Sequence, residues 1–351
     1  MTTFHHVLRR RFVFRSLAAW LAAGSMATAA MPVALAQEGS GAAAASRTPT
    51  GKVPAAVSVL SIVEHPSLDA LCDGLHDELK DAGYQDGKSL HWAYQSAQGN
   101  QGTAVQIARK FVGDRPDVIV PIATPAAQAV VSATHQIPVV YNAITDPIAA
   151  QIVKSMAPSG TNVTGVSDKL VADRQVAFIK RVVPDVKRVG IIYSPAEANS
   201  VSATREMKVA LEKQGISLVE VAAPRSIDVG QAAQRLVGKV DVIYTSNDNN
   251  VISAYESVIK VANAAKIPLI CADRSSVQRG ATGAMAIDYY RMGRQTGRMV
   301  LRILNGEKPG DIASETSDRL DITLNLDAAR RQGATLSPEL QAEASEIFGK
   351  P

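Results

Sequence analysis

The chain has 351 residues, of which 46% are hydrophobic and 20% charged, with 37 basic and 33 acidic side chains and two cysteines. This length is about twice that of a common domain, so two lobes are expected, and the composition excludes disordered, collagen-like and disulfide-scaffold proteins. The net charge of +4 arises within residues 1–36, because the rest of the chain carries 33 basic and 33 acidic side chains. With no basic excess in the body, a nucleic-acid partner is not expected.

Residues 1–36 have the parts of a secretory signal peptide: arginines at 9–11 and 15, an apolar run at 16–23, and an A-x-A cleavage site at 34–36. A membrane anchor is the alternative, but the apolar run is short and rich in alanine. Residues 9–12 (RRRF) also fit a twin-arginine export signal, and the export route stays open. No cysteine stands near the cleavage site to accept a lipid, so a free periplasmic protein is expected, with residues 37–53 as a disordered leader.

From residue 54 onward, short β-branched runs alternate with helical patterns, which is typical of βαβ units and parallel sheets. The first half predicts strands at 57–63, 90–94, 117–120 and 137–141, and helices at 66–83, 103–112 and 124–134. The second half predicts strands at 188–193, 217–221, 241–244 and 267–270, and helices at 199–215, 228–237 and 247–266. A strand at 284–287, a long helix at 288–304 and a last strand at 320–324 complete the pattern.

The two halves of the chain repeat one another. Residues 116–120 (PDVIV) are echoed by 240–244 (VDVIY), and residues 137–140 (IPVV) by 267–270 (IPLI). We therefore predict an α/β protein with two similar doubly wound, Rossmann-like lobes. The N-terminal lobe is expected to comprise 54–166 plus about 287–313, and the C-terminal lobe 167–286 plus about 314–345. The chain then crosses between the lobes three times, which makes a hinge, and a ligand would bind in the cleft at the carboxyl ends of the strands.

Motifs for catalysis are absent from the sequence. It contains no G-x-S-x-G, H-E-x-x-H, C-x-x-C or G-x-G-x-x-G pattern, and its last histidine is His135, so the second lobe has none to offer a shared catalytic site. Residues 83–89 (GYQDGKS) resemble a phosphate-binding loop but are one residue short between the glycines and stand between a helix and a strand, so we interpret them as a turn. We therefore expect neither an enzyme nor a cofactor or metal.

Short polar side chains occupy the predicted carboxyl ends of the strands. Thr124, followed by proline, is expected to cap its helix, so that the hydroxyl and free backbone N–H groups form a site suited to a carboxylate. Thr145 and Asp146, again followed by proline, occupy the same position after the next strand. There we expect Asp146 to cap the following turn rather than to bind the ligand. The remaining candidates are Glu64 after the first strand, Asn199, Ser200, Asp248 and Asn249 in the second lobe, and Asp288 before the long helix.

Five segments together resemble the periplasmic ABC-transporter substrate-binding family associated with tryptophan and tyrosine transport. They are residues 64–69 (EHPSLD), 123–129 (ATPAAQA), 145–147 (TDP), 197–200 (EANS) and 288–297 (DYYRMGRQTG), and the likeness covers 54 to about 335. The resemblance implies a type I periplasmic binding fold, a Venus flytrap that closes on an amino-acid-like ligand, favouring an aromatic one. It also implies delivery of that ligand to an inner-membrane permease, for which a monomer is the default.

An amino acid needs an anion site and a cation site. We expect Thr124, with Thr145, to bind the carboxylate, and Asp248 or Asp288 to bind the ammonium, because a charge-assisted hydrogen bond is the strong way to hold it. Asn199 and Ser200 would add contacts from the second lobe. For Asp288, a role as cap of the long helix is equally open. Candidates for an aromatic wall are Tyr141, Tyr193, Tyr244 and Tyr289, each of which could instead be core.

Two alternatives stay open. The same fold could bind a branched-chain amino acid, a purine or another small acid, or the protein could act as the sensor partner of a membrane receptor rather than of a permease. Cys72 and Cys271 could form a disulfide in an oxidising compartment, but buried free thiols are the simpler interpretation of two cysteines so far apart.

Overall fold

A computed structural model describes residues 48–317 and 319–350 of the chain. The predicted signal peptide and most of the predicted leader lie outside these residues. Within the described ranges, no helix has both the length and the apolar character needed to cross a membrane.

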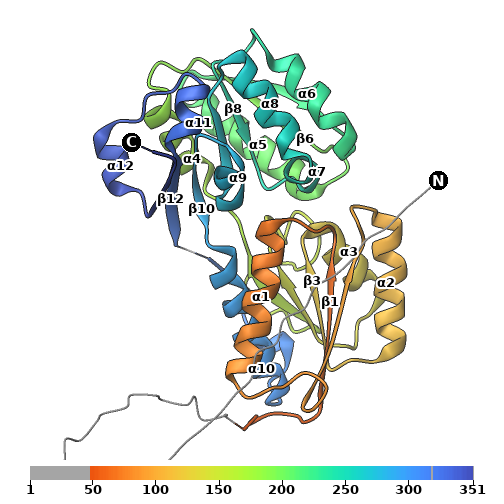
Figure 1. Ribbon diagram of the computed structural model, residues 1–351. Helices are drawn as coiled ribbons and strands as arrows, with labels where there is room; N and C mark the ends of the chain where they lie inside the picture. Colours follow the sequence, from red (N-terminus) through yellow and green to blue (C-terminus); the bar gives the residue numbers. More distant parts are fainter. Residues whose placement is uncertain (1–47, 318, 351) are drawn as a thin grey trace, which may run out of the picture. The chain divides into compact units, whose positions relative to one another are not determined.

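The N-terminal lobe is built on a six-stranded sheet in the order β11-β5-β4-β3-β1-β2, and all its strand pairs are parallel (Figure 1). Its strands are β1 (Ala55–Ser61), β2 (Leu90–Ser96), β3 (Val118–Ile122), β4 (Val139–Asn142), β5 (Val163–Ser167) and β11 (Glu315–Thr316). Its helices are α1 (Pro66–Asp81), α2 (Gln101–Asp114), α3 (Thr124–Ala133), α10 (Tyr289–Leu304) and the short 3-10 helix η2 (Pro309–Asp311). Both faces of the sheet are covered, so β3 is buried along its whole length.

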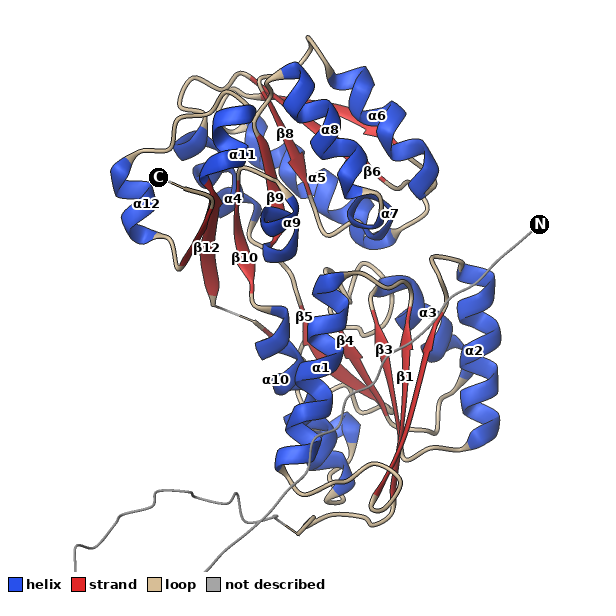
Figure 2. Ribbon diagram, viewed as in Figure 1, coloured by secondary structure: helices blue, strands red, loops and turns tan. Residues whose placement is uncertain are grey.

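The C-terminal lobe is built on a seven-stranded sheet in the order β13-β12-β10-β9-β8-β6-β7, in which only the β10–β12 pair is antiparallel (Figure 2). Its strands are β6 (Arg188–Tyr193), β7 (Ser217–Ala222), β8 (Val242–Thr245), β9 (Leu269–Asp273), β10 (Gly283–Ile287), β12 (Leu320–Asn325) and β13 (Glu346–Phe348). Its helices are α4 (Ala172–Val182), α5 (Ala198–Glu212), α6 (Val229–Leu236), α7 (Asn249–Ser253), α8 (Tyr255–Ala265), α9 (Arg274–Arg279), α11 (Leu326–Arg331) and α12 (Pro338–Glu343), with η1 (Ser226–Asp228).

The two sheets share one strand order, which confirms the predicted pair of doubly wound lobes. In each sheet the second strand lies outside the first, and the third, fourth and fifth follow on the other side. The strand order therefore reverses beside β1 and β3 in one lobe and beside β6 and β8 in the other. Crevices at such switch points, outside the carboxyl ends of the strands, are where open α/β sheets bind ligands.

The chain passes between the two sheets at three places. It leaves the first sheet after β5, returns to the first lobe between β10 and α10, and leaves again between β11 and β12. The second passage brings α10 against α1, two helices far apart in the sequence that lie side by side in Figure 1. Glycines permit this close approach, because a Cβ added at Gly74 would lie 2.1 Å from the carbonyl oxygen of Tyr290, and one at Gly293 would lie 2.0 Å from that of Leu71.

Several elements differ from the sequence-based expectation. The predicted helix at 247–266 is two helices, because Asp248 caps α7 and the chain turns at Ala254 before α8 begins. Helix α9 was not predicted, since its six residues begin with Arg274-Ser275-Ser276 and offer no apolar period; the Asp273 side chain caps it by accepting from the N–H of Ser276. The turn expected at 83–89 is confirmed.

Candidate functional site

The candidate site lies where the carboxyl ends of strands from both lobes meet their following loops. Thr124 follows β3 at the first switch point, and Ser246 and Asn247 follow β8 at the second. Asn199 belongs to the first turn of α5, after β6, and Asn142 ends β4. All five carry a buried side-chain nitrogen or oxygen for which the described residues supply no hydrogen-bond partner. Native proteins satisfy most buried polar atoms, so a group of unpaired ones at this position needs an explanation.

Thr124 does not cap its helix, which corrects the sequence-based expectation. The residue in the capping position is Ala123, with a φ of 71°, and Thr124 is the first residue inside α3. Its hydroxyl is therefore not used by the helix; it is 1% exposed and has no partner in the described structure. The first N–H groups of a helix have no acceptor within it, and Pro125 has no N–H, so the donors of this end belong to Thr124 and Ala126. The α3 N-terminus thus offers two backbone donors and one hydroxyl.

Asn142 adds a side-chain amide on the next strand. Its carbonyl oxygen accepts a 3.0 Å hydrogen bond from the N–H of Ala123, which ties the end of β4 to the residue before Thr124. The side chain is fully buried, and neither its nitrogen nor its oxygen has a partner among the described residues. One donor and one acceptor are therefore held beside the α3 N-terminus.

The C-terminal lobe presents acceptors. Asn199 donates from Nδ2 to the carbonyl oxygen of Asn247 at 2.9 Å and to Oε2 of Glu197 at 3.2 Å, which fixes its amide and leaves Oδ1 without a partner in the described part of the chain. Asn247 in turn donates from Nδ2 to Oδ2 of Asp168 at 2.9 Å, which leaves its own Oδ1 unpaired there too. Two oriented amide oxygens result.

Asp168 connects the two lobes at the first crossing of the chain, and the sequence-based reasoning missed it. The carboxylate accepts from the Thr145 hydroxyl at 3.0 Å, from Nδ2 of Asn247 at 2.9 Å and from the Tyr289 hydroxyl at 2.7 Å. Burial raises its pKa, and these three hydrogen bonds oppose that effect. Thr145 was expected to bind the carboxylate of the ligand, but its hydroxyl donates to the carboxylate of Asp168 instead.

Asp248, expected to take a ligand ammonium, is fully engaged inside the protein. It is completely buried and accepts from the N–H and the hydroxyl of Ser194, at 2.6 and 2.9 Å, and from the Ser200 hydroxyl at 2.5 Å. Its fourth hydrogen bond, from the N–H of Val251 at 2.9 Å, caps α7. Asp248 and Ser200 thus tie the loop after β6 to the loop after β8, and neither places a free polar atom in the cleft.

Glu197 holds the polar ends of α5 and α7 together. Its Oε2 accepts from Nδ2 of Asn249 at 2.6 Å and from Nδ2 of Asn199 at 3.2 Å. Burial, with a further contribution from the charge of Asp248, raises the pKa of Glu197 to about 7. Asn249, a predicted ligand residue, is therefore bonded to Glu197 through its amide nitrogen.

Asp146 makes the expected turn contact and also joins the lobes. Its Oδ1 accepts from the N–H of Ala149 at 2.9 Å, and its Oδ2 accepts from the Ser202 hydroxyl of α5 at 3.1 Å and from Lys169 at 3.4 Å. Burial alone would raise its pKa, but the Ala149 hydrogen bond, the Lys169 charge and the Ser202 hydrogen bond together lower it. Lys169 also donates to Glu206 of α5 at 2.7 Å, so one lysine at the crossing holds carboxylates of both lobes.

Two predicted site residues lie outside this group. Asp288 caps α10 by accepting from the N–H of Arg291 at 3.1 Å, and it lines a different pocket with Arg274 and Asp321. Glu64 is exposed in the loop between β1 and α1. The neighbouring His65 caps α1 instead, and burial is the main reason that its pKa falls to about 4.

A small pocket adjoins the polar groups. Thr145, Ser246 and Asn247 belong to its wall, together with Gln175 and Glu206. The rest of the wall is mostly apolar and consists of Leu170, Ala172, Ala203, Met207, Tyr244 and Ala272. Of the four tyrosines considered for an aromatic wall, Tyr244 lines this pocket. Tyr141 belongs to the N-terminal core, Tyr289 donates to Asp168, and Tyr193 is half-buried at the end of β6 and does not line this pocket.

Some of the residues that sequence reasoning missed left a usable signal. Ser246 stands between a predicted strand and the predicted helix at 247–266, and Asn247 is the first residue of that predicted helix, as Thr124 is in the other lobe. Asp168 and Gln175 left none, because residues 163–182 contain a strand and a helix that the sequence pattern did not predict.

Comparisons with known proteins identify the family to which the chain belongs. Residues 56–348 match the family model described as ABC transporter substrate binding protein. A curated relative, the "Tyrosine-binding protein" of Clostridioides difficile (strain R20291), is 38% identical over 293 residues, which cover 84% of this chain and 85% of that protein.

Two solved structures are also similar. A conserved domain protein from Vibrio cholerae superposes with a TM-score of 0.83 at 46% identity, covering 84% of this chain and 99% of the other. An ABC domain from Streptococcus pneumonia in complex with L-Trp superposes with a TM-score of 0.81 at 34% identity, with the same two coverages. The expected type I periplasmic binding fold is thereby confirmed, and the chain belongs to the family of ABC transporter substrate binding proteins.

Proposed function

We propose that this protein binds an aromatic amino acid, tyrosine or tryptophan, between its lobes and delivers it to an ABC-transporter permease. The observation that carries the proposal is the group of unpaired, buried polar atoms on Thr124, Asn142, Asn199, Ser246 and Asn247. They come from both lobes and from the strand ends at which such sheets bind ligands. The named ligand of the C. difficile relative and the L-Trp in the S. pneumonia structure support an aromatic amino acid as the cargo.

Membership of this family supports several general statements. Substrate binding proteins of ABC transporters are extracytoplasmic, take a small-molecule ligand and work with a permease. They are binding proteins rather than a class of enzyme. We propose further that the N-terminal signal exports this protein to the periplasm without a lipid anchor, and that it delivers its ligand as a monomer.

The α3 N-terminus suits the ligand carboxylate. Two backbone N–H groups without helical acceptors and the Thr124 hydroxyl converge there, and the positive end of the helix dipole favours an anion. The amide nitrogen of Asn142 lies on the adjoining strand end and can donate as well. A carboxylate needs donors only, which is what this lobe supplies in excess.

The C-terminal lobe suits the ligand ammonium. The Oδ1 atoms of Asn199 and Asn247 are oriented acceptors, because each side-chain nitrogen is already committed elsewhere. The carboxylate of Glu197 accepts a hydrogen bond from Asn199, and that of Asp168 accepts one from Asn247, so a negative charge adjoins each of these two asparagines. This assignment replaces Asp248 and Asp288, because the first has four internal donors and the second caps α10 in another pocket.

A ligand held in this way would bridge the lobes. Its carboxylate would contact the N-terminal lobe and its ammonium the C-terminal lobe, so it would bind more tightly when the lobes are together. That difference in affinity is what drives closure in a two-state binder.

A thermal-shift panel on protein freed of ligand by unfolding and refolding tests the proposal. Tyrosine and tryptophan at saturating concentration should raise the melting temperature, since a ligand at 100 times its Kd adds about 2.7 kcal/mol of stability. Leucine, a purine and a small carboxylic acid represent the alternative cargoes. A shift with one of these and none with an aromatic amino acid would contradict the proposal.

A further inference from the structure

Gln175 is a buried amide in the wall of the pocket that adjoins the polar site. It lies on α4 and is 1% exposed. Its Nε2 donates to the carbonyl oxygen of Met285 on β10 at 2.9 Å. Its Oε1 is buried and finds no partner in the part of the chain that the structure describes. Nothing in the architecture of the lobe accounts for this second atom.

The hydrogen bond to Met285 fixes which way the amide faces. A carbonyl oxygen can only accept, so the nitrogen of Gln175 must be the atom directed at Met285 and the oxygen must be the free one. The side chain therefore presents an acceptor and no donor to whatever occupies its surroundings. An isolated buried acceptor is costly unless a donor reaches it.

Three other polar residues of the pocket make hydrogen bonds within the protein. Thr145 and Asn247 both donate to Asp168, and Glu206 accepts from Lys169 at 2.7 Å. Ser246 has an unpaired hydroxyl, but a hydroxyl can rotate to donate or to accept. The Oδ1 of Asn247 is a second free acceptor, but the proposed function assigns it to the ligand ammonium, which leaves Oε1 of Gln175 as the free acceptor for another donor of the ligand. Leu170, Ala172, Ala203, Met207 and Ala272 contribute carbon surfaces to the same pocket.

We infer that Gln175 determines specificity by accepting a hydrogen bond from a donor on the ligand ring. This inference rests on the proposed function, with the ring in the apolar pocket. The indole N–H of tryptophan and the phenol O–H of tyrosine are such donors, and phenylalanine has none. The structure thus assigns the site to ring-donor aromatic amino acids rather than to aromatic amino acids in general.

The expected discrimination follows from leaving a buried acceptor without a partner. Phenylalanine should bind the wild-type protein about 5- to 150-fold more weakly than the better of tyrosine and tryptophan. Replacing the acceptor with an apolar group of similar length removes that penalty. Gln175→Met should therefore weaken binding of the ring-donor ligand, leave phenylalanine unchanged or improved, and bring the ratio near one.

Isothermal titration calorimetry of the full mature protein with L-Tyr, L-Trp and L-Phe tests the inference. Gln341→Met serves as the matched control, because Gln341 lies on α12 outside the pocket wall and also donates from Nε2 to a backbone carbonyl oxygen, that of Leu336 at 2.9 Å, so this variant should keep the wild-type ratio. If Gln175→Met does not fold, the comparison of L-Tyr with L-Phe on the wild-type protein still decides.

The outcomes distinguish failure of the proposed function from failure of the inference about Gln175. If none of the three ligands binds the wild-type protein, the proposed function fails, and the inference fails with it. If all three bind within about 3-fold of one another, or if Gln175→Met keeps the wild-type ratio, the inference about Gln175 is overturned while the proposed function stands. A preference for tyrosine or tryptophan that disappears in Gln175→Met, and persists in Gln341→Met, supports it.

Discussion

Thr124→Val tests whether the hydroxyl of Thr124 serves ligand binding or the stability of the fold. Valine has nearly the shape of threonine, so the substitution removes the hydroxyl and little else. In the free protein Thr124 is 1% exposed and its hydroxyl is buried without a partner in the described structure, so removing the hydroxyl should not lower the free energy of unfolding. Relief of a buried, unsatisfied group would raise it by as much as about 1–3 kcal/mol.

Ligand binding should change in the opposite direction. A hydrogen bond from a hydroxyl to a charged carboxylate is worth about 1.5–3 kcal/mol, which corresponds to roughly a 10- to 150-fold increase in Kd. The variant should therefore be at least as stable as the wild type without ligand and bind tyrosine or tryptophan one to two orders of magnitude more weakly. Urea unfolding of ligand-free protein measures the first quantity, and isothermal titration calorimetry the second.

Thr134→Val is the matched control at the other end of the same helix. The Thr134 hydroxyl accepts from the N–H groups of Gln136 and Ile137, at 3.2 and 3.1 Å. Its loss should lower the free energy of unfolding by about 1 kcal/mol and leave ligand affinity alone. A Thr124→Val protein that loses stability as the control does, with unchanged affinity, would refute a ligand role for Thr124.

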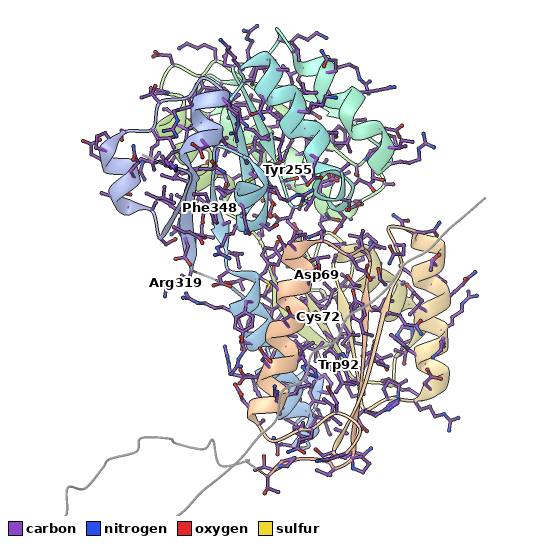
Figure 3. All side chains as sticks on the ribbon, viewed as in Figure 1. Asp69, Cys72, Trp92, Tyr255, Arg319 and Phe348 are labelled. Carbon is purple, nitrogen blue, oxygen red and sulfur yellow. The ribbon has the colours of Figure 1, made fainter. Side chains whose placement is uncertain are left out.

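Three other predictions concern packing, pH and the thiols. Gly74→Ala should lower the free energy of unfolding, measured by urea denaturation, by at least about 1–3 kcal/mol, because the added Cβ would overlap a backbone oxygen of α10. Gly113→Ala in α2 is the control: open space surrounds this glycine, so the substitution should raise the free energy of unfolding by about 0.5–1 kcal/mol. Because the pKa of Glu197 is raised from 4.5 to about 7, its contribution to stability is complete below pH 4.5 and is lost as pH rises to about 7. The stability of the wild type relative to Glu197→Gln should therefore fall across that window in denaturation series, and a difference that rises or stays constant would contradict the assigned pKa. Both cysteines are free, and burial raises the pKa of Cys72 on α1 (labelled in Figure 3) to about 12 and that of Cys271 on β9 well above its ordinary value. Iodoacetamide at pH 8 should therefore label both thiols in urea and neither of them quickly in the native protein. Fast labelling of the native protein would contradict the burial of these thiols.

The sequence pattern predicted the lobes well because their core strands are short and β-branched. A buried parallel strand must be apolar along its length, so β3, β6 and β8 stood out between turn residues. The echo between 116–120 and 240–244 then indicated two copies of one topology, and these segments contain the third strands of their sheets. Local composition was enough, because each of these elements is defined by its own residues.

The site was less accessible to sequence because its roles are set by partners from distant segments. Asp248 and Asp168 are both single carboxylates in loops after strands, yet one caps α7 and the other joins Thr145, Asn247 and Tyr289 across the lobes. Thr124 shows the same limit on a smaller scale. The Thr-Pro pair suggested a cap, but the left-handed φ of Ala123 places the helix start one residue earlier, which leaves the hydroxyl free.

Calorimetric titration of the ligand-free mature protein with L-tyrosine and L-tryptophan tests the central claim most directly. We predict saturable binding of at least one of them, with one ligand per chain, and a loss of that binding when Thr124 and Asn199 are altered together. Absence of binding to both, in a protein that binds a branched-chain amino acid or a purine, would contradict the account.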